Sequence, residues 1–544
     1  MNLNKMTRRE FLKTIARAGV WQSVAGLLAF QLPLPMIRMT EPLDQTQGVK
    51  MKLSNSDLVS ASDLELCYMP ASELLEHFRA KRLSPVDVLK AQIKRYEAIG
   101  KQVNCVTFTH FDEAMRAAQE SERRYANGNP RALEGITIGM KDEDAPAGWT
   151  MTAGSELLKD NVLDHNTPVV DKLLEAGVVM HLQTTVPEFY ALGCTWSNLW
   201  GVTRNPWNLQ YTVGGSSGGA GAALAAGITT LATGSDMGGS IRIPASLNGV
   251  YGFKPPHGRV PVVPGDEIMP QSTSGPMART LSDLALFQNA ICGPHPQQMS
   301  ALRPKLDYPI SYPNIRGWRI AYSPNQGWAT IDLDVKRNLE AALKILEQQG
   351  AIVEPIELRW QGPEIVAAVI KALLATGMGN MLLPFQNPRA QERMTSYGRY
   401  FAKLAQQELG AKQLGEAQAF AAKLFFEYDT LFAQGYRAFI CPTTATNRVP
   451  ADFDPTTPNA KLLINNEPVN PQTGWVMTSA FNLMYTIPVV NVPTGFDANR
   501  VPTGMQIAAR SYDDLAAFQV AFAYAQATPQ NFSGERMPDF RAQE

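Results

Sequence analysis

The most constraining feature of this sequence is a segment rich in glycine and serine at residues 214–239. It holds nine glycines, where ordinary usage predicts about two. An alanine-rich run and then a short apolar run separate its two Gly-rich ends, which predicts a helix at about 218–226 and a strand at about 228–234. A chain that leaves as a helix and returns as a strand can bring its two ends together. We therefore expect Ser216 and Ser240 to be neighbours.

The two Gly-rich ends are expected to be loops with accessible backbone N–H groups. Glycine lets the backbone approach a ligand closely, and successive N–H groups in such a loop form an anion-binding nest. The segment contains neither Gly-x-x-x-x-Gly-Lys-Ser/Thr nor Gly-x-Gly-x-x-Gly, so a nucleotide phosphate loop is excluded. A flexible linker is contradicted by the helix and the strand within the segment.

Gly214-Gly-Ser216-Ser-Gly218 also matches the Gly-x-Ser-x-Gly nucleophile elbow of α/β hydrolases. That enzyme type needs an acid and then a histidine after its serine. Only His257 and His295 follow Ser216, and the long remainder of the chain has no histidine. The scarcity of histidine disfavours a His-based triad and directs attention to another base.

A lysine is the alternative base. The apolar stretch that begins at Leu133 ends in Lys141, and burial at a strand end favours the neutral amine of a lysine. A neutral lysine can accept a proton from a serine hydroxyl, and a second serine can relay it. Taken alone, a lysine at a strand end is usually an ordinary surface lysine, and it is the spacing and the accompanying motifs that favour a base here.

Composition excludes several other classes. The chain of 544 residues has a formal net charge of −1, so we expect no nucleic-acid partner, because such proteins usually carry a basic excess. Its 45% apolar content is that of a folded protein. The five cysteines form no Cys-x-x-Cys pair, which predicts no zinc ribbon, redox motif or disulfide framework, and we expect them in the core.

The N-terminus resembles a twin-arginine export signal of bacteria. Arg8 and Arg9 precede Phe-Leu-Lys, and 20 uncharged residues lie between Arg17 and Arg38. Glutamines and prolines make this stretch only moderately apolar, which suits a signal better than a permanent span. No clear cleavage site closes it, so cleavage and N-terminal membrane anchoring both stay open. We expect a signal at 1–38, a linker at 39–60, and a periplasmic or otherwise exported protein.

The rest of the chain predicts one large α/β domain at 61–530. Helical patterns fill residues 62–125, and short β-like runs, Gly-rich turns and helices form a core at about 133–292. Residues 361–435 are mostly helical and are interpreted as an insertion. Strand patterns return at 438–441 and 487–493, and a final helix is expected at 513–526.

Several blocks in order resemble the amidase signature family of Ser-cisSer-Lys hydrolases. The resemblance covers most of residues 60–300 and returns at 438–526. The blocks that carry it are Gly214–Gly219, Gly238–Pro244, Gly249–Pro255, Gly258–Pro261, Thr184–Phe189, Asn205–Asn208, Pro442–Thr444 and Pro502–Gln506. This resemblance implies an α/β/α domain with a mixed central β-sheet covered by helices.

The resemblance also assigns roles to individual residues. Lys141 matches the catalytic lysine, Ser216 the bridging serine that follows a cis peptide bond, and Ser240 the nucleophile. The backbone N–H groups of the oxyanion hole match Met237, Gly238, Gly239 and Ser240. Asp236 and Arg242 match residues that hold this loop, and Ser217 matches a supporting serine. The acidic run Asp142-Glu-Asp144 departs from the usual pattern, which bears on the substrate's approach or on the lysine.

The function implied is hydrolysis of a carboxylic amide through a serine acyl-enzyme, with esters also open. No metal or organic cofactor is required, and the expected partners are a small-molecule amide and, during export, the twin-arginine translocase. The chain is expected to be a monomer or a homodimer. The alternatives that remain are a non-catalytic amide-binding protein and an amidotransferase A-like subunit. Aromatic residues beside the signature block could line an acyl pocket or simply pack: Tyr190, Trp196, Trp200 and Trp207.

Overall fold

The computed structural model describes residues 62–263, 266–407, 410–529 and 531–541. The predicted export signal and linker lie outside the described residues. The described residues all belong to one compact unit.

A mixed sheet of 11 strands crosses this unit, in the order β1-β3-β2-β8-β10-β9-β16-β17-β13-β11-β12. The strands β2/β3, β2/β8, β11/β12 and β11/β13 are parallel, and the remaining neighbours are antiparallel. The bounds are β1 Val106–Thr109, β2 Thr137–Lys141, β3 Val179–Thr184, β8 Leu231–Asp236, β9 Tyr251–Lys254, β10 Thr273–Ala278, β11 Arg319–Tyr322, β12 Ile352–Pro355, β13 Tyr436–Pro442, β16 Val489–Phe496 and β17 Pro502–Ala508. Three two-stranded ribbons are β4 Trp196–Ser197 with β5 Gly201–Val202, β6 Arg204–Asn205 with β7 Asn208–Thr212, and β14 Leu462–Ile464 with β15 Glu467–Val469.

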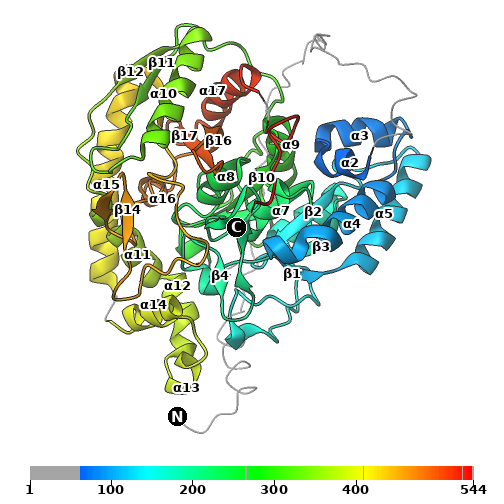
Figure 1. The fold of residues 1–544 in the computed structure, drawn as a ribbon, viewed down its shortest axis with the longest axis horizontal. Helices are drawn as coiled ribbons and strands as arrows, with labels where there is room; N and C mark the ends of the chain where they lie inside the picture. The colour runs from blue at the N-terminus through cyan, green and yellow to red at the C-terminus, as the bar shows by residue number, and fades with distance from the viewer. Residues whose placement is uncertain (1–61, 264–265, 408–409, 530, 542–544) are drawn as a thin grey trace, which may run out of the picture. The chain divides into compact units, whose positions relative to one another are not determined.

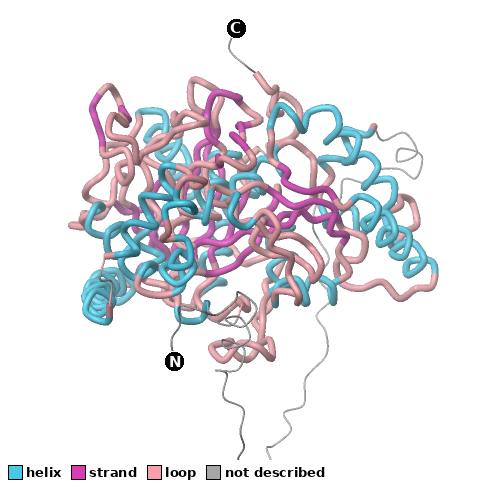
Figure 2. The backbone as a smooth tube through the Cα atoms, turned by 90° about the horizontal axis from the view of Figure 1, so that it is seen from below, coloured by secondary structure: helices cyan, strands magenta, loops and turns pink. Residues whose placement is uncertain are grey.

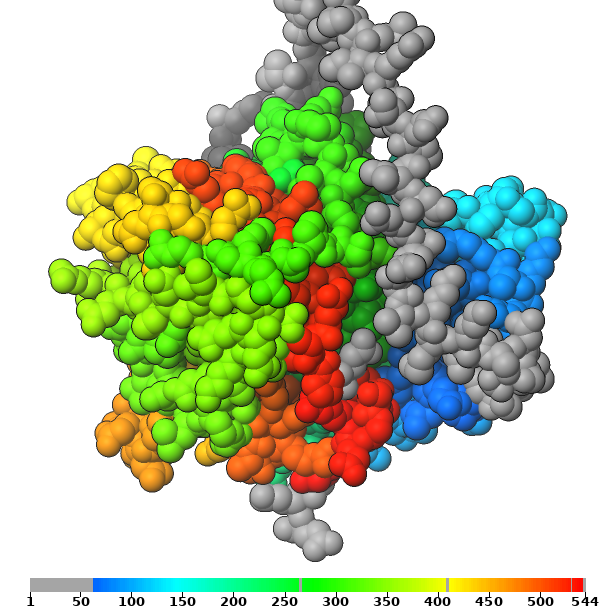
Figure 3. Space-filling model, turned by 90° about the horizontal axis from the view of Figure 1, so that it is seen from above, coloured from blue at the N-terminus to red at the C-terminus, as the bar shows by residue number. Residues whose placement is uncertain are grey.

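Helices lie on both sides of the strands (Figure 2). They are α2 Asp63–Tyr68, α3 Ala71–Arg79, α4 Pro85–Val103, α5 Phe111–Ala126, α6 Pro168–Ala176, α7 Gly218–Ala225, α8 Arg242–Asn248, α9 Leu281–Ile291, α10 Leu333–Gln348, α11 Gly362–Leu374, α12 Gly377–Leu382, α13 Pro388–Gln391, α14 Ser396–Gln406, α15 Ala411–Ala433, α16 Ser479–Leu483 and α17 Asp514–Gln526. The helices α3–α5 and α15 lie at opposite sides of the molecule (Figures 1 and 3).

Two main apolar cores sandwich the sheet. One joins α3, α6, α9, α10 and α17 to inward side chains such as Ile138 and Met140 of β2. The other joins α11, α15 and α16 to residues of β13, β16 and β17, such as Phe439. Because side chains alternate along a strand, Lys141 points to the face opposite that of Met140. The predicted α/β/α domain with a mixed central sheet is confirmed.

Local signals in the sequence explain where several elements begin. The Ser84 hydroxyl accepts a hydrogen bond from the Val86 N–H, 3.0 Å away, and Pro85 takes the first position of α4. The expected helix after Ser217 is α7, and the returning strand is β8, which begins three residues later than predicted. The helical insertion appears as α11–α15.

The described residues form neither a disulfide nor a metal cluster. All five cysteines are free and buried, as expected. In this part of the chain, no group of three or more metal-ligating side chains gathers. No single described helix is long and apolar enough to cross a membrane, although α11 and the adjoining 377–385 segment, bent by 60°, pass that test as a pair.

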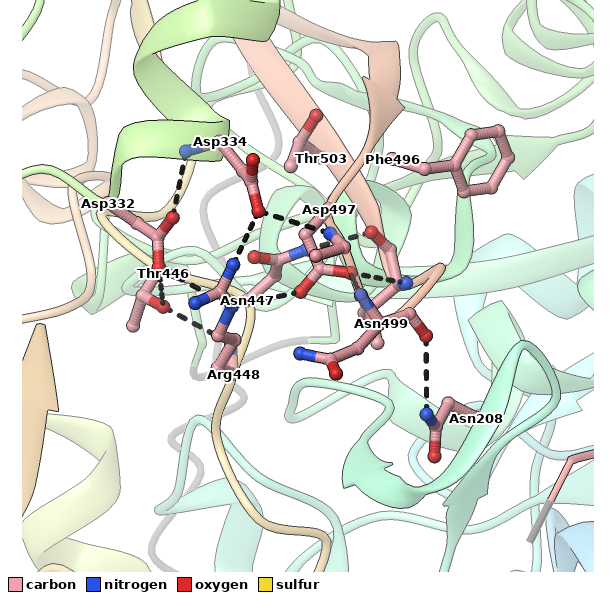
Figure 4. A network of polar contacts seen from close by, with 12 residues as sticks. Asn208, Asp332, Asp334, Thr446, Asn447, Arg448, Phe496, Asp497, Asn499 and Thr503 are labelled. Atoms are coloured by element: carbon pink, nitrogen blue, oxygen red, sulfur yellow. Dashed lines mark hydrogen bonds and ion pairs between the residues drawn. The ribbon is translucent and has the colours of Figure 1, made fainter. Parts of the chain in front are cut away.

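One arginine joins three carboxylates beside the last hairpin of the sheet (Figure 4). Arg448 lies 3.3 Å from Asp497 and 3.7 Å from Asp332, and it also pairs with Asp334 at the start of α10. All three carboxylates are largely buried, whereas the Arg448 side chain is 39% exposed. The guanidinium therefore ties α10 and the loop after β13 to the β16–β17 connection.

Replacing Arg448 with Met is expected to destabilise the protein by about 1–2 kcal/mol. Breaking a fully buried pair costs about 3–5 kcal/mol, but solvent reaches this guanidinium and reduces the loss. Chemical denaturation followed by circular dichroism measures the change. An unchanged unfolding midpoint would show that the three carboxylates do not depend on this cation.

Candidate active site

The predicted lysine ends β2 in a fully buried position. The Nζ of Lys141 lies 2.9 Å from the Oγ of Ser216 and 2.6 Å from the Oγ of Ser235. Its backbone N–H donates to the Thr233 hydroxyl of β8, 2.8 Å away, which fixes the strand end. The sequence therefore places a buried amine against a serine hydroxyl, as expected from the apolar run before Lys141.

Ser216 lies in the loop before α7, and its peptide bond to Gly215 is cis. This loop runs so close to another segment that a Cβ at Gly215 would lie 2.6 Å from the Leu192 carbonyl oxygen, which explains the glycine. The cis bond agrees with the role that the resemblance implies for Ser216.

The two serine loops are in direct contact. The Ser217 N–H donates to the Ser240 carbonyl oxygen, 3.1 Å away, so the helix–strand return does bring the loops together. The Ser217 hydroxyl donates to the carbonyl oxygen of Ser235 and accepts from its N–H, both at 3.3 Å. Because these contacts are with the backbone of β8, Ser217 supports the loop and does not join the chain of hydroxyls.

Ser240 lies in the loop between β8 and α8, where it faces a cavity of about 150 Å³. Met237 and Gly238 line the same cavity. The N–H of Gly239 instead donates to the Asp236 carboxylate, 2.8 Å away. Of the four predicted oxyanion donors, three therefore border the cavity, whereas the Gly239 N–H serves to hold the loop.

A buried ion pair fixes the shape of this loop. Two nitrogens of Arg242 each lie 2.9 Å from an oxygen of Asp236, and both side chains are fully buried. Burial alone would raise the pKa of Asp236, but the charge and hydrogen bonds of Arg242 hold that pKa below its usual value. Asp236 therefore stays ionised and receives the Gly239 N–H.

Arg242 has three further partners that the sequence did not single out as site residues. It donates to the Thr478 carbonyl oxygen at 2.9 Å, and to Gln506 and Asn482 at 2.6 Å each. Gln506 stood in one of the resembling blocks, whereas Asn482 and Thr478 follow no recognisable pattern. Their contacts anchor the loop to α16 and β17.

Replacing Gly239 with Ala is expected to lower kcat by about 10²–10³-fold, the loss typical of one oxyanion donor. The added Cβ would lie 2.1 Å from the Thr478 hydroxyl oxygen, and the φ of +134° disfavours any side chain. The loop must shift, and its N–H groups shift with it. Steady-state kinetics on any hydrolysed amide measures the effect.

Gly238→Ala provides the matched control, because its Cβ would meet no atom within 4 Å. This variant should keep the thermal stability of the wild type. Equal kcat for Gly239→Ala and wild type would contradict the role of the loop geometry.

The cavity beside Ser240 is predominantly apolar. It is lined by Tyr190, Ala191, Leu192, Gly193, Cys194, Gly215, Met237, Gly238, Ser240, Ile243, Val366, Val369, Ile370, Leu373, Met378, Phe401, Phe453, Pro455, Thr456, Gln472, Trp475, Val476 and Ser479. The helical insertion supplies one wall through α11, α12 and α14. An uncharged, apolar group of a substrate fits this environment.

Of the four aromatic residues proposed for an acyl pocket, the structure brings one to the cavity. Tyr190 lines it, with its ring centre 5.1 Å from the Lys141 Nζ. Trp196, Trp200 and Trp207 do not line it. The indole N–H of Trp196 donates to the carbonyl oxygen of Phe453, a lining residue, whereas those of Trp200 and Trp207 donate to the Thr152 hydroxyl and the Asn248 carbonyl oxygen. Trp475 lines the cavity instead, from a region where no motif pointed to it.

A buried amine, a chain of hydroxyls, a nucleophile that faces a cavity and adjoining backbone N–H groups define a class of enzyme. They are the parts of a serine hydrolase that cleaves acyl compounds with lysine as the base. A family model described as "Amidase" matches residues 87–517. The chain belongs to this amidase signature family, whose members hydrolyse carbon–nitrogen bonds of amides.

The relatives include enzymes with different names. The chain is 30% identical over 475 residues to the acylamidase of Rhodococcus erythropolis, covering 86% of this chain and 97% of the relative. It is 31% identical over 484 residues to a subunit of the glutamyl-tRNA(Gln) amidotransferase of Carboxydothermus hydrogenoformans, covering 86% and 98%, respectively. A bacterial aryl acylamidase structure has a TM-score of 0.77 at 27% identity and covers 85% of this chain and 97% of its own.

Proposed function

We propose that this protein is an exported bacterial amidase for small amides that carry an uncharged, apolar group beside the scissile carbonyl. The proposed substrate class rests on the apolar cavity at Ser240. Among the described residues, the side chains that line this cavity include no lysine, arginine, aspartate or glutamate. A charged group would lose its hydration there without gaining a partner.

In the proposed reaction, the neutral amine of Lys141 accepts a proton from the Ser216 hydroxyl, which takes one from Ser240. The Oγ of Ser240 attacks the amide carbonyl carbon and forms a tetrahedral intermediate. The backbone N–H groups of Met237, Gly238 and Ser240 stabilise the negative oxygen. Ser216 then gives a proton to the leaving nitrogen and regains one from the Lys141 ammonium, the C–N bond breaks, and an acyl-enzyme remains with Lys141 neutral again.

Water completes the cycle by the same relay. Its proton passes toward Ser216 as its oxygen attacks the acyl carbon, and the Ser240 oxygen leaves and recovers a proton. The products are a carboxylic acid and an amine or ammonia. The chain's own residues provide every proton transfer in this scheme.

The proposed location rests on the N-terminal sequence. The pair Arg8–Arg9 and the uncharged stretch that follows support export by the twin-arginine translocase, with cleavage or retention as an anchor. Substituting Lys for both arginines should keep the protein in the cytoplasm of a bacterial host. Unchanged export would contradict the signal.

A role in a tRNA-dependent amidotransferase is the second candidate, because one component of such an enzyme is 31% identical to this chain. That role needs a cytoplasmic protein with partner subunits, which the export pattern disfavours. We propose a monomer or a homodimer instead. Size-exclusion chromatography with light scattering, and a search for co-purifying proteins, separates the two.

The central experiment is a panel of amides given to the purified protein. Aryl and aliphatic acyl amides should be hydrolysed, whereas matched amides with a carboxylate on the acyl group should be poor substrates. A fluorophosphonate probe should label Ser240, which distinguishes an enzyme from a non-catalytic amide-binding protein. A preference for charged acyl groups would overturn the proposed substrate class.

A further inference from the structure

The acidic run after the lysine contains a carboxylate in direct contact with the catalytic amine. An oxygen of Glu143 lies 2.7 Å from the Lys141 Nζ. The turn that follows β2 causes this contact, because the N–H groups of Glu143 and Asp144 both donate to the Lys141 carbonyl oxygen, at 2.6 and 2.9 Å. The chain folds back and lays the Glu143 side chain against the residue two positions earlier.

The three oxygens around Nζ match the three N–H groups of an ammonium. They belong to Ser216, Ser235 and Glu143, at 2.9, 2.6 and 2.7 Å, respectively. The Ser235 hydroxyl also donates to the Glu143 carboxylate, which fixes its position. Three acceptors, one of them negatively charged, complement the three N–H groups that a lysine carries as an ammonium.

This arrangement opposes the proposed chemistry, in which Lys141 must be neutral to accept a proton. We propose that Glu143 is a positioning residue that stabilises the ammonium of Lys141 and thereby confines amide hydrolysis to higher pH. The inference rests on the proposed function of Lys141 as the base. The Glu143 carboxylate thereby controls the proton relay between Lys141 and the two serines, Ser216 and Ser240.

The other groups that face Lys141 do not supply such a counter-charge. The Tyr190 ring covers Nζ, and the Tyr190 hydroxyl donates to the Asp142 carbonyl oxygen. The Asp142 carboxylate binds the Thr152 N–H and hydroxyl, and burial raises its pKa to about 7. The Asp236 carboxylate is paired with Arg242. Asp142 is therefore the group that a test must separate from Glu143.

The test is the pH dependence of kcat/KM for the Glu143→Gln variant. A nearby charge of opposite sign favours the charged form of its partner. Without the carboxylate, the acidic limb of the profile should move to lower pH. The Lys141 side chain is fully buried and the Glu143 side chain is 21% exposed, so the variant is expected to lose some stability, and the profile is measured at a temperature where it is folded.

Two further variants, Glu143→Asp and Glu156→Gln, test whether the shift depends on the position of the carboxylate beside Lys141. Glu143→Asp retains the charge but shortens the side chain, so its acidic limb should lie between those of the wild type and Glu143→Gln. Glu156→Gln removes the same charge from a pair with Arg393, 3.5 Å away, and should leave the limb in place. The rate of Ser240 labelling by a fluorophosphonate should show the same shifts, because it reports activation of Ser240 without product release.

An unshifted limb in both Glu143 variants would overturn the inference. The inference would also be overturned if the acidic limb of the pH profile moved in the Asp142→Asn variant but not in Glu143→Gln, because Asp142 would then be the controlling group. Failure of the proposed function gives a different result, because the wild type would then neither hydrolyse amides nor label at Ser240.

Discussion

Replacing Ser240 with Ala is expected to lower kcat/KM for amide hydrolysis by about 10⁴–10⁶-fold. Removing the nucleophile of a serine hydrolase leaves only substrate binding and the oxyanion donors, and losses of this size result. Ser240 lies at the cavity and no other hydroxyl in the relay replaces it, because Ser216 is fully buried beside Lys141. Kinetics on the purified variant and loss of fluorophosphonate labelling measure the change.

Ser246→Ala is a matched control for this variant. Ser246 is a fully buried serine of α8, close to the nucleophile in sequence, and its hydroxyl has no hydrogen-bond partner among the described residues. Its removal should leave the rate close to that of the wild type. If Ser240→Ala retained wild-type hydrolysis, the nucleophile would have to be another residue.

Replacing Asp236 with Asn is expected to destabilise the protein by about 3–5 kcal/mol and to abolish most activity. The substitution leaves the fully buried Arg242 guanidinium without its counter-charge, the costly outcome for a buried pair. It also weakens the acceptor of the Gly239 N–H, which shapes the oxyanion loop. Denaturant unfolding and kcat measured at a temperature where the variant is folded separate the two effects.

An exposed ion pair provides the comparison. Glu354→Gln removes the carboxylate that lies 2.8 Å from Arg319, where both side chains are more than a third exposed. Solvent and salt screen that pair, so the melting temperature should change little. Equal stability of the Asp236→Asn variant and the wild type would show that Arg242 does not need its partner.

The parts of the site that were predictable are encoded by local patterns in the sequence. The glycine pattern and the helix–strand return predicted that the loops of Ser216 and Ser240 meet, and the contact between Ser217 and Ser240 confirms it. The strand-end position of Lys141 followed from the apolar run that precedes it. These inferences needed only local periodicity and glycine chemistry.

The parts that were missed depend on the order of strands in the sheet. Asn482 lies in α16 and Thr478 caps its N-terminus, more than 230 residues after Arg242 in the sequence. The strand order β8-β10-β9-β16-β17 brings these parts of the chain together, and no local pattern encodes that order. Trp200 and Trp207 were candidates for the pocket, but each finds a hydrogen-bond partner away from it. Composition cannot tell an aromatic side chain in a pocket from one in a core.

The wall formed by α11 has a consequence for how such enzymes diversify. The reacting groups come from residues 141–242, whereas Val366, Val369 and Leu373 of α11 and Phe401 of α14 shape the space that a substrate occupies. One wall of the cavity is thus encoded in a stretch of the chain that carries no reacting group, whereas residues such as Tyr190 and Met237 line the cavity from the stretch that does. Exchange of residues 361–406 between relatives is a route to new selectivity that leaves the reaction itself intact.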